Sequence, residues 1–305
     1  MDRRVIVTGA TGLIGAALCR RLQERGYAPV VFSRDPARAR TQLPGLGDYV
    51  AWEPAEDGAW ASALDGAYGV VSLAGAPVFG PRWTPAYKRE IRDTRTVGTR
   101  GLVRAMAKAR SQPQVFVSAS AIGVYGFRDD TPLDETAAPG TDFLAQVCVA
   151  WEAEARAAEA LGVRTSLQRI GIVLARDGGP LYYMALPTRL GLGGYILPGN
   201  QWVSWVHIED AVSAVLLALE DERVRGPVNV VAPDARRHRD FMRTLGRCLR
   251  RPVWAPVPGF ALRLAVGEFA QTLTTGQRVV PARLEAWGYR FRYPMLEPAL
   301  RDLLG

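Results

Sequence analysis

A glycine-rich turn near the start of the chain has the spacing of a phosphate-binding loop. Three glycines recur every three residues between a short β-branched run at residues 4–8 and a helical pattern over residues 12–25. In such a turn the first glycine permits a sharp bend, the second lets a pyrophosphate approach the backbone, and the third lets the helix pack closely. The free N–H groups and the dipole of the helix start attract phosphate. We therefore predict a dinucleotide site formed by Gly9, Thr11, Gly12, Leu13, Ile14 and Gly15.

The tip of the second predicted strand carries the residues that select between the two nicotinamide dinucleotides. An acidic residue at this position binds the two ribose hydroxyls of NAD, whereas an arginine accommodates the 2′-phosphate of NADP. Here Ser33 and Arg34 stand at the tip, and Asp35 follows one place later. We predict NADP as the cofactor, and the nearby Asp35 leaves NAD open as the alternative.

An alternation of strand-like and helix-like segments places these residues. Strands are predicted over residues 4–8, 29–33, 49–52, 69–73, 114–118 and 164–170, and helices over 12–25, 85–109 and 143–161. This alternation predicts an α/β fold, a doubly wound, Rossmann-like parallel sheet. We expect residues 1–175 to form the dinucleotide-binding domain, with its sheet completed by parts of 200–232. Residues 176–305 are expected to form a smaller, mostly helical C-terminal lobe.

Composition sets the broad class of the protein. With 305 residues and 48% hydrophobic residues the chain can bury a core, and its apolar runs are shorter than a bilayer span needs. The net charge is +8, but the arginines are spread along the chain, so we expect a small-molecule substrate rather than nucleic acid. The three scattered cysteines and two histidines predict neither a disulfide framework nor a metal site. We expect a cytoplasmic protein without membrane contact, and the oligomeric state stays open.

Longer segments of the chain resemble one protein family. The glycine pattern resembles that of extended short-chain dehydrogenases/reductases. The segments VSASAIGVYG (117–126) and QWVSWVHIED (201–210), with the C-terminal stretch from Arg251 to Pro294, resemble NAD(P)-dependent epimerases/dehydratases of the bacterial "sugar nucleotide epimerase" type. The resemblance covers essentially the whole chain. It implies an NADP-dependent oxidoreductase or epimerase that acts on a carbohydrate-like or nucleotide-linked substrate.

The resemblance also implies which residues contact the cofactor. The glycine turn would hold the pyrophosphate, while Ser33 and Arg34 would hold the phosphate on the adenosine ribose. Further contacts are implied for Leu73, Ala74 and Gly75 at the end of the fourth strand, for Glu90 and Arg95 on one face of the long helix, and for Ser118 and the Gly171-Ile172 turn near the nicotinamide.

The proton relay of that superfamily is missing from the sequence. Its members use a tyrosine and a lysine four residues later, and the lysine lowers the pKa of the tyrosine so that it can exchange a proton. The corresponding residues here are Phe143 and Val147. The two lysines of the chain, Lys88 and Lys108, lie upstream on another helix, so neither is expected to replace the missing pair.

Two hydroxyl groups remain as candidate catalytic residues. Ser120 is the favoured counterpart of the serine that polarises the substrate, although counting back from Tyr125 lands on Ala121 instead. Tyr125 is the remaining candidate acid/base, and a packed aromatic side chain is the alternative interpretation. Because the usual pair is absent, a non-catalytic NADP(H)-binding sensor or interaction module stays as the alternative function.

Several other residues are open to two interpretations. Trp83, Trp202 and Trp205 could stack on a flat or sugar-like ligand, or they could belong to the core. His207 could face a cleft or form a hydrogen-bonded structural link. Asp210 follows shortly after it and is expected to cap a helix or to lie in its first turn.

Overall fold

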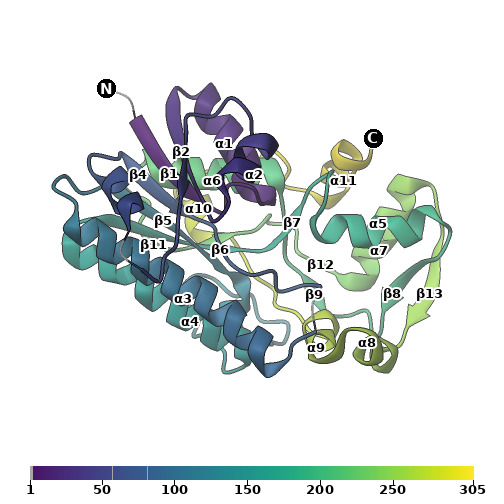
Figure 1. The fold of residues 1–305 in the computed structure, drawn as a ribbon. Helices are drawn as coiled ribbons and strands as arrows, with labels where there is room; N and C mark the ends of the chain where they lie inside the picture. Colours follow the sequence, from purple (N-terminus) through teal and green to yellow (C-terminus); the bar gives the residue numbers. More distant parts are fainter. Residues whose placement is uncertain (1–2, 57, 81) are drawn as a thin grey trace.

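The computed structural model describes residues 3–56, 58–80 and 82–305. At its centre lies a sheet with the strand order β11-β6-β5-β4-β1-β2-β3, in which every neighbouring pair is parallel (Figure 1). Helices cover both faces, so the prediction of a doubly wound α/β fold is confirmed. The strand order reverses between β1 and β4, and the carboxyl ends of these two strands form the switch point at which such sheets bind ligands.

The strands fall into one large sheet and three small pairs. The large sheet consists of β1 (Arg3–Thr8), β2 (Tyr27–Ser33), β3 (Asp48–Ala51), β4 (Gly69–Ser72), β5 (Val115–Ala121), β6 (Arg164–Ile170) and β11 (Gly226–Val230). The pairs are β7 (Ile172–Leu174) with β10 (Trp205–His207), β8 (Gly193–Ile196) with β13 (Val253–Val257), and β9 (Trp202–Val203) with β12 (Arg236–Arg237).

Two layers of helices bury the two faces of the sheet. Helices α1 (Leu13–Glu24) and α6 (Ile208–Glu220) share a core with Val5 and Val7 of β1. Ile6 lies between these valines in the strand and therefore points to the other face, where it shares a core with α3 (Pro85–Lys108). Helix α4 (Phe143–Arg156) packs beside α3 on that face, as Figure 1 shows. The helix α2 (Pro36–Gln42) follows β2.

The starts of the two long helices follow from local capping residues. The Thr84 hydroxyl accepts the N–H of Tyr87 at 3.1 Å, and Pro85 takes the first helical position. Asp142 caps α4 in the same way by accepting two backbone N–H groups. The predicted helix over 143–161 is two elements, because after α4 the chain tightens into the 3₁₀ helix η3 (Ala157–Leu161).

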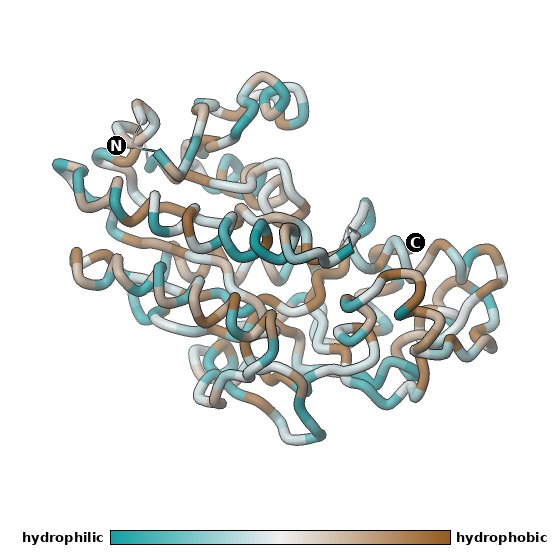
Figure 2. Tube along the Cα trace, turned by 60° about the horizontal axis from the view of Figure 1, so that its bottom comes forward, coloured by the Kyte–Doolittle hydropathy of each residue, from teal (hydrophilic) through white to brown (hydrophobic). Residues whose placement is uncertain are grey.

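A smaller, mostly helical lobe lies beside the sheet (Figure 1). Its core is formed by side chains such as Leu181 of α5 (Gly179–Arg189), Phe241 of α7 (His238–Leu249) and Leu300 of α11 (Leu296–Leu304). Figure 2 shows that apolar segments lie mainly in the interior and hydrophilic segments mainly outside. The remaining elements are α8 (Gly259–Val266), α9 (Ala270–Thr274), α10 (Ala282–Ala286), and the 3₁₀ helices η1 (Ala59–Leu64), η2 (Ile122–Tyr125) and η4 (Gly267–Phe269).

Asp210 connects α6 to the chain at residues 292–293, near the C-terminus. This residue lies in the first turn of α6, as expected, but its buried carboxylate accepts the backbone N–H groups of Arg292 at 2.7 Å and Tyr293 at 2.9 Å. The cap of α6 is His207, whose Nδ1 accepts the N–H of Glu209 at 3.1 Å. His207 is therefore a structural link, and burial lowers its pKa.

Replacing Asp210 with alanine is expected to lower the free energy of unfolding by about 2–4 kcal/mol, because two backbone N–H groups lose their buried acceptor. Asp210→Asn keeps one acceptor oxygen and should cost less. Urea denaturation of the three proteins measures the difference. An alanine variant as stable as the native protein would show that the C-terminal segment is held by other contacts.

Candidate functional site

The glycine turn joins β1 to α1 at the switch point of the sheet. Gly9 has a φ of +67°, a conformation that side chains with a Cβ rarely adopt, and its carbonyl accepts the N–H of Gly12 at 3.0 Å. A Cβ on Gly15 would lie 2.2 Å from that carbonyl oxygen, so only glycine lets α1 pack this closely. Gly12 is exposed, and a Cβ there would meet the same oxygen at 3.2 Å. The turn thus presents the N-terminal end of α1 to solvent.

Thr8, which the sequence analysis did not single out, holds the neighbouring loop against this turn. Its hydroxyl accepts the N–H groups of Leu73 at 3.2 Å and Ala74 at 3.3 Å. A Cβ on Gly9 would lie 2.8 Å from the Ala74 nitrogen, so the two backbones are in close contact. The end of β4 and the glycine turn therefore form one continuous edge. The link could have been predicted from the sequence, because a residue with a hydroxyl group ends the first strand.

Arg95 brings a positive charge to the same edge. Its guanidinium packs on Gly75, where a Cβ would lie 2.9 Å from Cζ, and Nη1 donates to the carbonyls of Ala76 and Ile91 at 3.0 and 2.9 Å. Burial lowers the pKa of Arg95. Within the part of the chain that the structure describes, no carboxylate forms an ion pair with it. An anionic ligand group at this edge would therefore meet an uncompensated cation.

Glu90 does not share the face of α3 that carries Arg95. Five helical residues turn the helix by about 500°, so the two side chains point about 140° apart. Glu90 is accordingly exposed, whereas Arg95 is half-buried against Gly75. The expectation that both lie on one face is wrong, and of the pair only Arg95 lies beside the switch point.

The tip of β2 leaves one side chain free for a ligand. The N–H of Asp35 donates to the Ser33 hydroxyl at 3.1 Å, and the Asp35 carboxylate accepts the N–H of Arg38 at 2.9 Å. Asp35 is thus occupied as the N-cap of α2. Arg34 is exposed and forms no hydrogen bond or ion pair to any residue placed by the structure. At the tip of β2 the Arg34 side chain is therefore available to bind a ligand, whereas the Asp35 carboxylate is not.

The predicted residues near the nicotinamide differ in exposure, because Ser118 is buried whereas Gly171 and Ile172 are partly exposed. Ser118 is fully buried within β5, beside Ser72 of β4. Gly171 allows a close approach, since a Cβ there would lie 2.7 Å from the Ser204 carbonyl oxygen, and the N–H of Ile172 donates to that oxygen at 2.9 Å. Gly171 and Ile172 therefore form the junction between β6 and β7 as well as part of the predicted site.

Tyr125 and Ser120 belong to a buried network of hydrogen bonds. The Tyr125 hydroxyl donates to Oδ1 of Asn229 at 2.6 Å and accepts from Nη1 of Arg169 at 3.0 Å. The Ser120 hydroxyl donates to Glu152 at 2.8 Å, and Arg169 binds both oxygens of that carboxylate at 2.8 and 2.9 Å. The network links β5, α4, β6 and β11 through the interior.

This burial removes both hydroxyls from the set of candidate catalytic groups. Tyr125 is 0% exposed, its hydroxyl is already engaged as donor and as acceptor, and burial raises its pKa. Ser120 is 3% exposed and points at Glu152. A group that transfers a proton must reach the substrate oxygen within about 2.6–3.2 Å. Neither side chain can do so from this position, so the interpretation of Tyr125 as a packed aromatic is the one that the geometry supports.

The positions of the missing relay are filled by apolar packing. Val147 is buried with Ala76 and Ile91 between α3 and α4, and Phe143 packs on the edge of the same cluster. The ring of Trp83 meets that of Phe143 edge-on, with 5.4 Å between centroids. Trp83 is thus a wall of the site, whereas Trp205 is fully buried in the core of the smaller lobe.

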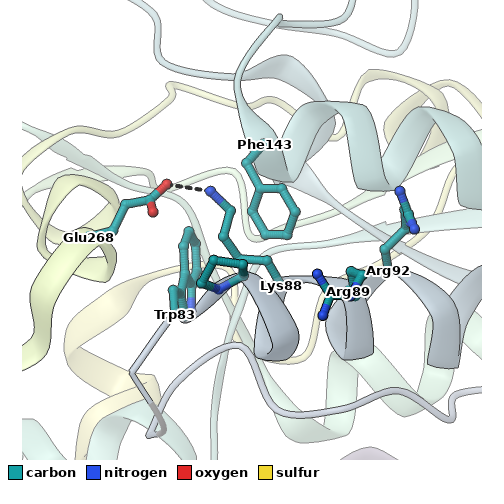
Figure 3. Close-up of a pocket in the computed structure, with 7 residues that line it drawn as sticks. Trp83, Lys88, Arg89, Arg92, Phe143 and Glu268 are labelled. Carbon is teal, nitrogen blue, oxygen red and sulfur yellow. Dashed lines mark hydrogen bonds and ion pairs between the residues drawn. The ribbon is translucent and has the colours of Figure 1, made fainter.

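Lys88 lies next to Phe143, although its place upstream in the sequence led to the expectation that neither lysine replaces the missing pair. Its Nζ is 4.5 Å from the centroid of the Phe143 ring and 2.7 Å from a carboxylate oxygen of Glu268 in η4. Figure 3 shows this ammonium between the ring and the carboxylate, in a pocket of about 350 Å³. Lys88 lies on α3 and Phe143 lies on α4. These two helices are neighbours, which the order of the sequence alone did not show.

Across residues 3–56, 58–80 and 82–305, no three His, Cys, Asp or Glu side chains are grouped so that they could hold a metal ion. Over those same residues, no helix is both long and apolar enough to span a bilayer.

The chain belongs to the NAD dependent epimerase/dehydratase family, whose model matches residues 5–231. This confirms the resemblance stated from the sequence motifs. Residues 257–303, which include Glu268, match a second model described as a domain of unknown function, DUF1731.

Relatives match over nearly the whole chain. The chloroplastic "Epimerase family protein SDR39U1 homolog" of Arabidopsis thaliana is 38% identical over 98% of this chain and 86% of its own length. The crystal structure of human epimerase family protein SDR39U1 (isoform 2) with NADPH is 33% identical, covers 98% of both chains and has a TM-score of 0.88. A nucleoside-diphosphate sugar epimerase from Corynebacterium glutamicum is 31% identical, with a TM-score of 0.80 over all of this chain and 59% of that one.

Substituting Tyr125 with phenylalanine should lower the free energy of unfolding by about 1–3 kcal/mol, because Asn229 and Arg169 each lose a buried partner. Tyr182→Phe removes a hydroxyl from a side chain that is 48% exposed and should leave stability unchanged. Chemical denaturation of both variants tests the structural role. Equal stability of Tyr125→Phe and the native protein would contradict it.

Proposed function

We propose that this chain is an NADP(H)-dependent oxidoreductase or epimerase that binds its cofactor across the carboxyl ends of β1, β2 and β4. The observation that carries the proposal is the exposed end of α1 behind Gly9 and Gly12, with Arg34 free at the next strand tip. The human relative with the same fold was crystallised with NADPH, which supports this choice of cofactor.

Each part of such a cofactor has residues of this chain that fit it. The backbone N–H groups that begin α1, at Leu13 and Ile14, would bind the pyrophosphate together with Thr11. Arg34 and Ser33 would bind the 2′-phosphate. The remainder would lie along Leu73, Ala74 and Gly75, where Arg95 supplies a positive charge, and reach toward Gly171 and Ile172, whereas the buried Ser118 would support this edge from within β5.

The reacting end of the substrate would lie near Phe143. A bound reduced nicotinamide supplies hydride, and a substrate oxygen that gains charge then needs a hydrogen-bond donor. Of the two lysines, Lys88 reaches the Phe143 ring, and Glu268 holds its ammonium there. We propose that Nζ of Lys88 donates to the substrate oxygen in place of the missing tyrosine hydroxyl.

A Gly12→Val variant should stay folded and lose cofactor binding. A Cβ at this position meets only the Gly9 oxygen at 3.2 Å, so the backbone can adjust by a few tenths of an ångström, but the branched side chain would occupy the space of the pyrophosphate. Titration with NADPH, followed by the change in its fluorescence, measures the affinity, and circular dichroism checks the fold. A folded variant with native affinity would show that the glycine turn holds no phosphate.

NADPH should bind more tightly than NADH, and the difference should depend on Arg34. Loss of one charge-assisted phosphate contact costs about 1.5–3 kcal/mol, which corresponds to a factor of roughly 10–100 in affinity. Arg34→Ala should therefore weaken NADPH binding by that factor and leave NADH binding unchanged, as measured by calorimetry. Arg110→Ala, which alters an exposed arginine before β5, serves as the matched control. Equal affinities for the two cofactors in the native protein would reject the preference.

A non-catalytic NADP(H) sensor is the second candidate function. It is favoured by Phe143 and Val147, which cannot carry the relay, and by the burial of Tyr125. The decay of NADPH absorbance with a panel of small carbonyl compounds and sugar nucleotides separates the two functions. Binding without turnover of any compound supports the sensor, whereas turnover supports the oxidoreductase or epimerase.

A further inference from the structure

The cleft between the N-terminal end of α3 and the C-terminal segment carries an excess of positive charge. The pocket beside Phe143 meets a second one of about 1040 Å³ at Glu268, which lines both. Over the whole chain 38 basic residues stand against 30 acidic ones. Among the residues described around the two pockets, by contrast, a single carboxylate faces five cations: Arg82, Lys88, Arg89, Arg92 and Arg263.

Three of these cations are not neutralised by a protein carboxylate. Lys88 is paired with Glu268 at 2.7 Å, and Arg92 with Asp93 at 3.0 Å. Arg82, Arg89 and Arg263 form no ion pair with any residue that the structure describes. A concave surface with uncompensated cations attracts an anionic ligand.

The larger pocket also exposes apolar side chains. Phe260 is 72% exposed and lines it together with Leu197, which is 37% exposed. Phe260 lies on α8, a largely apolar helix in which no residue is buried. Large apolar side chains exposed in a concave site, beside a few charged groups, are typical of a pocket that binds a partly apolar small molecule.

We propose that this cleft binds a small acid with an apolar body, in which Arg82 and Arg263 hold the acidic group while Phe260 and Leu197 contact the body. The proposal rests on the proposed function, because it names the substrate class of the same site. Nη2 of Arg82 donates to the carbonyl of Leu264 at 2.7 Å, which holds its guanidinium beside α8. Glu268 lines both pockets but is already paired with Lys88 at 2.7 Å. Arg82 and Arg263 line the larger pocket without such a partner, so the acidic group lies there and the body extends toward Phe143.

Three probes that share one apolar body test the charge preference. Guanidinium groups bind carboxylate and phosphate alike, so 2-naphthoate and 2-naphthyl phosphate are compared with uncharged 2-naphthalenemethanol. Calorimetry on the full chain at low salt should give at least one anion an affinity about tenfold or more above that of the alcohol. The better anion identifies the acidic group. An alcohol that binds as tightly as both anions, or no binding of either anion at millimolar concentration, would overturn the proposal.

Variants at the two arginines test the assignment of the acidic group. Arg82→Gln with Arg263→Gln should abolish the advantage of the anion, whereas lysine at both positions should retain most of it. Both side chains are exposed, so the fold should survive, and Arg110→Gln is the matched control. An unchanged advantage in the glutamine variant would overturn the assignment. NADPH titration of the same samples separates the hypotheses: NADPH binding without anion preference rejects this proposal alone, and failure to bind NADPH rejects the proposed function.

Discussion

The buried ion pair between Arg169 and Glu152 joins α4 to β6 in the interior of the protein. The guanidinium donates to both carboxylate oxygens, and the two side chains are only 9% and 7% exposed. Removing one partner of such a pair leaves a buried charge and costs about 3–5 kcal/mol. Because Phe143 is the first residue of the same helix, the position of its ring, and with it one wall of the cleft, depends on this pair.

The same network of hydrogen bonds extends to the segment of residues 257–303. It also explains why the hydroxyl groups of Tyr125 and Ser120 are not free to take part in catalysis. Asn229 accepts from Tyr125 and donates its own backbone N–H to Glu135, whose carboxylate also accepts the N–H of Arg283. Burial raises the pKa of Glu135, while these N–H groups oppose that shift. Residues that resemble catalytic groups by their place in the chain thus hold the segment of residues 257–303 near the sheet.

The sequence predicted those features that depend only on residues close together in the chain. The turn from Gly9 to Gly15 follows from backbone conformation within a few residues, and it was predicted. The environment of Tyr125 was not predictable in this way, because its partner Asn229 lies 104 residues further along the chain. Nor could the sequence show that Lys88 lies over Phe143, because this contact requires the packing of α3 against α4.

The two halves of the site are built from different parts of the chain. The proposed cofactor half consists mainly of backbone at the ends of β1 and β4, so it tolerates little change at its glycines. The opposite wall consists of side chains from α8 and η4, such as Phe260 and Glu268. Substitutions there alter shape and charge without disturbing the glycine turn. The face of the Phe143 ring stabilises the Lys88 ammonium. In the proposed function this ammonium supplies the polar group that the ring lacks.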